Sequence, residues 1–297
     1  MQLKLSNVPE GHKKSKAFFR DNENGLEKAK LFQKAYAKIN LTLDILEKRA
    51  DNYHEINSIM QQIDLYDELT FEKSEDIIVQ SQFKDDIILK TILRLKDISQ
   101  IKEGVTVYVK KNIPTAAGLA SGSTDAATTL IALNQLWNLN LSPKDLIKIG
   151  AELGADIPFC LIGKSCFVSG KGEIVEKIAL PEMNILLINP GYEISTKQAY
   201  EELDEKQYEK KSSSLKLKNL KDIKEIASNL YNDFIHIQKD DVKDIIKQLI
   251  NNGALNASIT GKGPTVFGIF ENKEKAEQAY NNLKDKYKFV YLTKTII

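Results

Sequence analysis

The chain has 297 residues, of which 42% are hydrophobic and 28% charged, and its formal net charge is +1 at pH 7. These values are ordinary for a globular protein of one large or two moderate domains, and the near-neutral charge argues against binding to nucleic acid or to an anionic membrane. No apolar run reaches the ~18 residues of a membrane span, and having only Cys160 and Cys166 suits the reducing cytoplasm better than a disulfide framework or a four-ligand zinc site.

The first 33 residues are polar and basic and contain no apolar core of a signal peptide. Glu10, Asp21 and Glu23 also argue against a transit peptide. We expect residues 1–33 to form a flexible arm or an oligomer contact, with a short helix at Asn24–Gln33. The chain is expected to be a monomer or a weak homodimer.

Polar and apolar residues alternate through the segment Lys34–Leu46, which is the period of a strand with one apolar face. Lys38 and Asn40 fall two residues apart on the polar face of this strand, so their side chains project as a pair. On the pattern alone, an ordinary solvated lysine is a commoner explanation for Lys38 than a role in an active site.

The turn Arg49–Glu55 places Tyr53 and His54 next to each other. A tyrosine ring can stack on a nucleobase and an imidazole can hydrogen-bond a pyrimidine edge, although a surface turn with an amphipathic tyrosine is the alternative. Asn52 is expected to adopt a positive φ angle, which asparagine tolerates better than most residues. Two further strands are predicted at 56–65 and 69–72, with Asp64 and Asp67 in their connection.

A strand, a loop of small residues and a helix follow one another between Val105 and Trp137. This order is typical of phosphate binding, because small residues let backbone N–H groups approach an anion and a helix N-terminus adds free N–H groups and a positive dipole end. Gly118 and Gly122 fit neither a Walker A loop nor a dinucleotide fingerprint. A tight turn before a buried helix is the alternative. The candidate residues are Pro114, Thr115, Ala116, Ala117, Gly118, Leu119, Ala120, Ser121, Gly122, Ser123 and Thr124.

A helix is predicted from Pro143 to about Leu153, because Ser142 suits the N-cap and proline suits the first turn. Asp156 follows it in a short apolar segment, where an acid that caps a turn is the alternative to a catalytic carboxylate. The remaining predictions are a hairpin at 167–177, strands at 184–189, 257–261, 265–270 and 289–295, helices opened by Ser195-Thr196-Lys197 and at 221–234, 240–251 and 273–286, and an exposed connection at 205–219.

Several segments together resemble the GHMP kinase superfamily. They are the loop Pro114–Ala127, the A-K-I-N-L run that contains Lys38, the Arg49–His54 turn and the Gly154–Phe159 segment, and they occur in the family's order. The resemblance covers about 35–295. It implies an α+β fold with two domains, an ATP-binding N-terminal domain at 34–180 and a C-terminal α/β sandwich at 181–297.

The resemblance also implies an activity. ATP with Mg²⁺ would phosphorylate the 2-hydroxyl of 4-diphosphocytidyl-2-C-methyl-D-erythritol, a cytidine-diphosphate methylerythritol of the non-mevalonate isoprenoid-precursor pathway. Lys38 and Asp156 are then the expected catalytic residues, and the loop Pro114–Thr124 binds the ATP phosphates. The expected substrate-binding residues are Asn40, Tyr53, His54 and Thr196. No protein-bound metal site, nucleic acid or membrane is expected.

The chain departs from the family pattern at a few positions. Ser121 and Asn52 replace glycines, Thr124 replaces a serine, and Lys262 lies in a Gly261-Lys262-Gly263 loop where the family has serine or threonine. Lys262 either adds a cation near phosphate or faces solvent. Another GHMP kinase, such as a homoserine or mevalonate kinase, remains an alternative, as do a non-catalytic ATP-gated binding protein and a purely structural protein.

Overall fold

A computed structural model describes residues 30–81 and 87–297. The chain forms two compact units. Unit 1 comprises the described residues up to Ala35 together with Tyr66–Asn112 and Gly122–Leu161, and unit 2 comprises Tyr36–Leu65, Ile113–Ser121 and Ile162–Ile297. Two neighbouring long strands, β1 (Lys30–Lys48) and β2 (His54–Ser74), contribute to both units. The units therefore do not follow chain order, and the domain assignment 34–180 and 181–297 stays a prediction.

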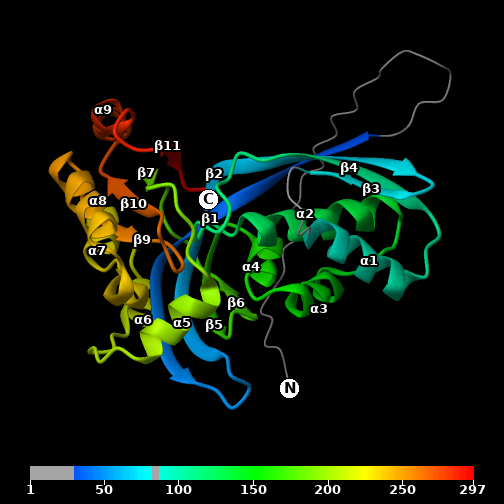
Figure 1. Ribbon diagram of the computed structural model, residues 1–297, viewed down its shortest axis with the longest axis horizontal. Helices are drawn as coiled ribbons and strands as arrows, with labels where there is room; N and C mark the ends of the chain where they lie inside the picture. Colours follow the sequence, from blue (N-terminus) through cyan, green and yellow to red (C-terminus); the bar gives the residue numbers. More distant parts are fainter. Residues whose placement is uncertain (1–29, 82–86) are drawn as a thin grey trace. The chain divides into compact units, whose positions relative to one another are not determined.

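Unit 1 is a sheet with helices on one face (Figure 1). Strand β4 (Gly104–Lys110) pairs antiparallel with the second half of β2 and parallel with β3 (Ile77–Gln80). The helices are α1 (Ile87–Ser99), α2 (Ser121–Leu136), α3 (Pro143–Leu153) and the short α4 (Ile157–Ile162). They bury their apolar side chains against those of the strands, in a core that includes Phe71, Ile92, Leu95, Val105, Val107, Leu130, Leu133 and Trp137.

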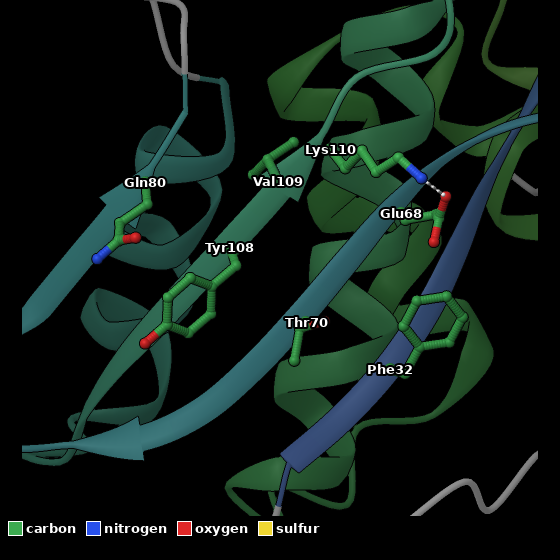
Figure 2. Close-up of a pocket in the computed structure, with 7 residues that line it drawn as sticks. All are labelled: Phe32, Glu68, Thr70, Gln80, Tyr108, Val109 and Lys110. Carbon is green, nitrogen blue, oxygen red and sulfur yellow. Dashed lines mark hydrogen bonds and ion pairs between the residues drawn. The ribbon is translucent and has the colours of Figure 1, made fainter. Parts of the chain in front are cut away.

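The opposite face of this sheet carries a shallow hollow (Figure 2). Phe32, Thr70 and Tyr108 line it from three neighbouring strands, and an ion pair between Lys110 and Glu68 closes one side at 2.8 Å. Lys110 is exposed and Glu68 is half-buried, as expected for the outward face of an antiparallel pair.

Unit 2 contains the first half of β2, which pairs with β5 (Ser165–Gly170), and β5 pairs with β6 (Ile174–Lys177). Strand β1 pairs in parallel with the short β8 (Tyr231–Asn232). A second, antiparallel sheet has the order β11-β7-β10-β9. Its strands are β7 (Asn184–Asn189), β9 (Asn256–Ile259), β10 (Val266–Phe270) and β11 (Phe289–Lys294).

The apolar run of β7 is buried because it is the inner strand of this second sheet, with β10 and β11 on either side. Side chains of α8 (Asp240–Asn251) and α9 (Lys273–Leu283) complete that core. The other helices of unit 2 are α5 (Thr196–Asp204), α6 (Ser213–Leu217), α7 (Ile223–Ser228) and the 3-10 helix η1 (Asp233–Ile237).

Most predicted elements are confirmed, and the α+β class with them. Helix α3 begins as predicted, because Ser142 accepts a hydrogen bond from the Asp145 backbone and the Asp145 carboxylate accepts one in return. Within the described residues, no helix is long and apolar enough to cross a membrane.

Four predictions are wrong in part. The segments 56–65 and 69–72 form the single strand β2, because the polar residues between them lie in the ladder rather than in a turn. Lys30–Gln33 belong to β1 instead of a helix, and the rest of the predicted N-terminal arm lies outside the described residues. The connection 205–219 contains α6, in which Leu217 is fully buried. The predicted helix 221–234 ends early, at Ser228, before β8.

Candidate active site

The predicted phosphate loop connects β4 to α2 and has an unusual backbone. Ala116, Gly118 and Ala120 have φ angles of 50°, 80° and 61°. For alanine this left-handed conformation costs energy, so such residues persist where the surroundings hold them and are concentrated at functional sites. These positive φ angles at every second residue curl the loop tightly just before α2 begins at Ser121.

Gly118 makes a very close contact between the loop and another segment of unit 2. A Cβ atom built on it would lie 2.1 Å from the carbonyl oxygen of Thr260, far inside van der Waals contact. Thr260 Oγ1 donates a hydrogen bond of 3.0 Å to the Gly118 carbonyl oxygen. Glycine is therefore required here both by φ and by the close approach of a second backbone.

Lys38 and Asn40 of β1 complete this contact. Lys38 Nζ donates to Asn40 Oδ1 at 2.6 Å and to the Gly118 carbonyl oxygen at 3.0 Å. Asn40 Oδ1 also accepts from the Gly261 backbone N–H at 2.9 Å, while its Nδ2 donates to Ser58 Oγ at 2.8 Å. The predicted pair is thus confirmed as a pair, and it is hydrogen-bonded to the phosphate loop and to the Gly261 loop.

Both side chains are deeply buried, with Lys38 3% and Asn40 1% exposed. The alternative of an ordinary solvated lysine therefore does not hold for Lys38. Burying polar groups costs free energy unless they are hydrogen-bonded, and this network supplies the bonds. The result is an ammonium group held at a fixed place beside the loop, which is what electrostatic stabilisation of a phosphoryl group requires.

Side chains from other segments of unit 2 hold the backbone of the Gly261-Lys262-Gly263 loop in place. Gln238 Nε2 donates to the Lys262 carbonyl oxygen at 3.0 Å, and Asn232 Nδ2 donates to that of Gly261 at 2.9 Å. Both glycines have positive φ angles, 54° and 79°. The backbone of Lys262 is thus fixed next to the phosphate loop, and its role near phosphate stays a prediction.

Asp156 lies in unit 1, directly before α4, and is half-buried. Its backbone carbonyl accepts a hydrogen bond from the Cys160 N–H at 3.1 Å, so the turn that contains it is continuous with the helix. Its pairing with Lys38 stays a prediction.

The Tyr53–His54 turn forms a second cluster in unit 2. Asn52 has a φ of 64°, as predicted from its tolerance for that conformation. Tyr53 is 54% exposed, and Lys171 Nζ lies 4.4 Å from the centre of its ring. An exposed, cation-flanked tyrosine ring is a ready surface for stacking.

His54, by contrast, is buried and held by two groups of α5. Its Nε2 lies 2.7 Å from Asp204 Oδ1, and its ring stacks on Tyr200 at 4.7 Å between centres. Burial raises the pKa of Asp204, but hydrogen bonds from Lys48 and His54 outweigh it and leave that pKa below its usual value. His54 is therefore positioned by α5 rather than free in a surface turn.

Thr196, the fourth predicted substrate-binding residue, is exposed at the start of α5, where Ser195 is the N-cap. Tyr200 and Asp204 follow at intervals of four residues, so the three side chains share one face of the helix. Sequence reasoning missed Tyr200 and Asp204. The helical spacing from Thr196 was the available signal, but nothing in the sequence linked it to His54.

Among the described residues, no three histidine, cysteine or acidic side chains gather closely enough to hold a metal ion. Ser123 and Thr124 in the first turn of α2 carry hydroxyl oxygens of the kind that Mg²⁺ and its waters contact, and Mg²⁺ at phosphate sites keeps several waters and takes few protein ligands.

Comparison with known protein families gives two matches. The model described as GHMP kinases N terminal domain matches residues 86–164, and the model described as GHMP kinases C terminal matches residues 212–288. The first match includes the phosphate loop and Asp156, and the second includes the Gly261 loop.

Curated relatives match over nearly their whole length. The chain is 45% identical over 279 residues to the 4-diphosphocytidyl-2-C-methyl-D-erythritol kinase of Caldanaerobacter subterraneus subsp. tengcongensis, an alignment that covers 90% of this chain and 97% of that protein. It is 39% identical over 277 residues to the kinase of the same name from Clostridium tetani, covering 89% and 99%.

Solved structures share the fold. A crystal structure of 4-(cytidine 5'-diphospho)-2C-methyl-D-erythritol kinase superimposes with a TM-score of 0.74 at 24% identity, covering 89% of this chain and 99% of that one. A homoserine kinase from Cytophaga hutchinsonii gives a TM-score of 0.72 at 18% identity, covering 93% and 98%. At these identities the likeness establishes the fold alone.

Proposed function

The chain belongs to the GHMP kinase family, and from that premise we propose that it transfers the γ-phosphoryl group of ATP to the 2-hydroxyl of 4-diphosphocytidyl-2-C-methyl-D-erythritol. The family membership supports a small-molecule kinase that uses ATP. The narrower substrate rests on the names of the curated relatives and on the Tyr53–His54 cluster.

One observation carries the proposal for the catalytic machinery. The Lys38 ammonium is hydrogen-bonded to the carbonyl oxygen of Gly118, in the middle of the phosphate loop. A buried cation beside such a loop is placed to stabilise charge that develops on transferred phosphoryl oxygens. The loop Pro114–Ser121, with the first turn of α2, would hold the ATP phosphates through backbone N–H groups.

The remaining roles follow from the chemistry of phosphoryl transfer. Asp156 accepts the proton of the substrate 2-hydroxyl, whose oxygen then attacks the γ-phosphorus while ADP leaves. Lys38 stabilises the negative charge that develops on the transferred phosphoryl group. Mg²⁺, when bound with ATP, neutralises phosphate charge, and the hydroxyls of Ser123 and Thr124 are the groups that would contact its water shell.

The cytidine end of the substrate is assigned to the second cluster. Tyr53 offers an exposed ring for stacking on the base, and His54 offers a nitrogen whose orientation Asp204 and Tyr200 fix. Asn40 and Thr196 would contact the methylerythritol and diphosphate portions. We place the reaction in the cytoplasm, where free thiols such as those of Cys160 and Cys166 persist, and expect a monomer or weak homodimer.

The test is ADP release by the purified protein with ATP and Mg²⁺, in parallel reactions with the cytidine-diphosphate methylerythritol, homoserine and mevalonate. Turnover with the first substrate alone is expected. Turnover with homoserine or mevalonate alone would refute the proposed substrate but would agree with membership of the kinase family. ATP binding without turnover of any of the three alcohols would refute the proposed catalytic roles.

A further inference from the structure

The two chain segments on either side of the phosphate loop are joined by a buried ionic cluster. Lys111 lies just before the loop, and its Nζ donates at 2.6 Å to Asp125 Oδ2, which lies in the second turn of α2. The same Nζ makes a very short contact with Asp67 Oδ2 of β2. Asp67 Oδ1 in turn accepts the backbone N–H of Asn112 at 2.6 Å. The entry to the loop and its exit are thus tied to one another and to a strand.

This cluster is hidden from solvent. The side chains of Lys111, Asp67 and Asp125 are 12%, 0% and 5% exposed. An ion pair removed from water in this way cannot lose one partner without leaving an uncompensated buried charge, so the connection is hard to open. The two chain segments on either side of the phosphate loop are therefore held together far more firmly than surface hydrogen bonds would hold them.

We propose that Asp67, Lys111 and Asp125 form a clamp that positions the phosphate loop for the phosphates of ATP, an inference that rests on the proposed kinase function. The three are positioning residues, since they act through the backbone that they hold. Asp67, Lys111 and Asp125 are not among the predicted site residues, and the proposed chemistry does not use them.

The charge balance of the clamp adds a second property. Two carboxylates share one ammonium, so the cluster carries a net negative charge when all three groups are ionised. Burial raises the pKa of Asp125 to about 7, with Lys111 opposing the shift and Asp67 adding to it. Asp125 Oδ1 also has no hydrogen-bond partner within the described part of the chain. Asp125 therefore holds a proton below neutral pH and releases it above.

Loss of the Asp125 proton should weaken nucleotide binding. Above pH 7 the clamp gains a negative charge close to the start of α2, where an anion would bind, so ATP binding weakens as pH rises. Below pH 7 the clamp is neutral. We expect the dissociation constant for Mg·ATP to rise roughly fivefold between pH 6 and pH 8, at the low end of typical couplings between sites.

The neighbouring surface pair supplies matched controls. Glu68 and Lys110 are adjacent in sequence to Asp67 and Lys111, but they pair on the outer face of the sheet, with Lys110 69% exposed (Figure 2). Exposed pairs of this kind contribute little to stability, and a change in them leaves the contacts between the two ends of the phosphate loop intact.

The experiment measures Mg·ATP binding by calorimetry at pH 6 and pH 8, without the second substrate, for wild type, Asp125→Asn and Glu68→Gln. The Asp125→Asn protein should bind equally at the two pH values after correction for the titration of ATP, which is common to all three. Glu68→Gln should follow wild type. A pH effect that survives in Asp125→Asn, or that disappears in Glu68→Gln, overturns the proposal.

A second measurement tests the clamp itself. Asp125→Ala removes the bond to Lys111, and the backbone amides of 113–121 should then exchange with solvent about tenfold faster in the nucleotide-free protein, whereas in Glu68→Ala they should not. Unchanged exchange in Asp125→Ala overturns the clamp. Both measurements avoid turnover, so a protein that shows the clamp but phosphorylates none of the tested alcohols would refute the proposed function alone.

Discussion

Replacing Gly118 with alanine should damage the site more than any other change of a single methyl group in the loop. The added Cβ would lie 2.1 Å from the Thr260 carbonyl oxygen, which is backbone and cannot rotate away. The phosphate loop and the Thr260 segment would have to separate by more than an ångström to reach ordinary contact. Both hydrogen bonds to the Gly118 carbonyl oxygen, from Lys38 and Thr260, would be lost or lengthened.

The magnitude has two parts. A left-handed φ of 80° costs alanine roughly 1 kcal/mol more than glycine. Loss of one neutral and one charge-assisted hydrogen bond adds about 1 and about 2 kcal/mol. We therefore expect the free energy of unfolding to fall by roughly 3–5 kcal/mol, with a loss of ATP affinity because the loop has moved away from Lys38.

Gly253→Ala provides the control. Gly253 has a similar φ of 93°, but nothing lies within 4 Å of the position that its Cβ would take. This variant should lose only the backbone strain of about 1 kcal/mol and should bind ATP normally. Urea unfolding and ATP titration of both variants measure the difference. Equal losses in the two proteins would show that strain alone accounts for Gly118, and that the close contact does not constrain the loop.

Three further predictions concern the charged groups. Asp156→Ala should lose nearly all turnover, at least about 100-fold, while ATP binding is retained; near-normal turnover would contradict its role as a base. Asp204→Asn should raise KM for the cytidine substrate several-fold and leave KM for ATP unchanged, because it releases His54 rather than the phosphate loop; a change in KM for ATP would contradict that division. Finally, the pKa of Asp125 is raised from 3.8 to about 7 in the folded protein, so wild type should lose stability relative to Asp125→Asn as pH rises between these values. The loss should be at most about 1.4 kcal/mol per pH unit, and no further change is expected above pH 7. Denaturation at pH 5, 6, 7 and 8 tests the sign of this effect.

Local signals predicted most of the fold. The capping box of α3, the alternation in β1 and β4, and the positive φ of Asn52 all depend on residues within a few positions of one another, so the sequence displays them directly. The order strand, loop, helix around Gly118 was predictable for the same reason. These features give the elements and the loop, but not their contacts.

Long-range contacts account for what was missed. Tyr200 and Asp204 hold His54 from about 150 residues further along the chain, and single-sequence patterns carry no information on that pairing. The sequence places Asp67 in a predicted connection between two strands, because polar residues of this kind are typical of turns. In the structure it is an interior strand residue whose charge is met by Lys111, and only the partner makes its burial tolerable.

The buried polar row of β1 shows why such contacts matter for function. On the alternation alone, an ordinary solvated lysine was the commoner explanation for Lys38, yet Lys38, Asn40, Thr42 and Asp44 are all at most 3% exposed. Thr42 Oγ1 accepts from Ser214 Oγ and Asp44 Oδ2 from the Ser214 N–H, while Lys38 and Asn40 bond to the glycine loops. Apolar side chains of similar size would fill this space at no desolvation cost and are often as stable. Lys38 and Asn40 are therefore better explained by a chemical role than by packing. An apolar residue at position 38 would preserve the core but would leave no cation beside the phosphate loop.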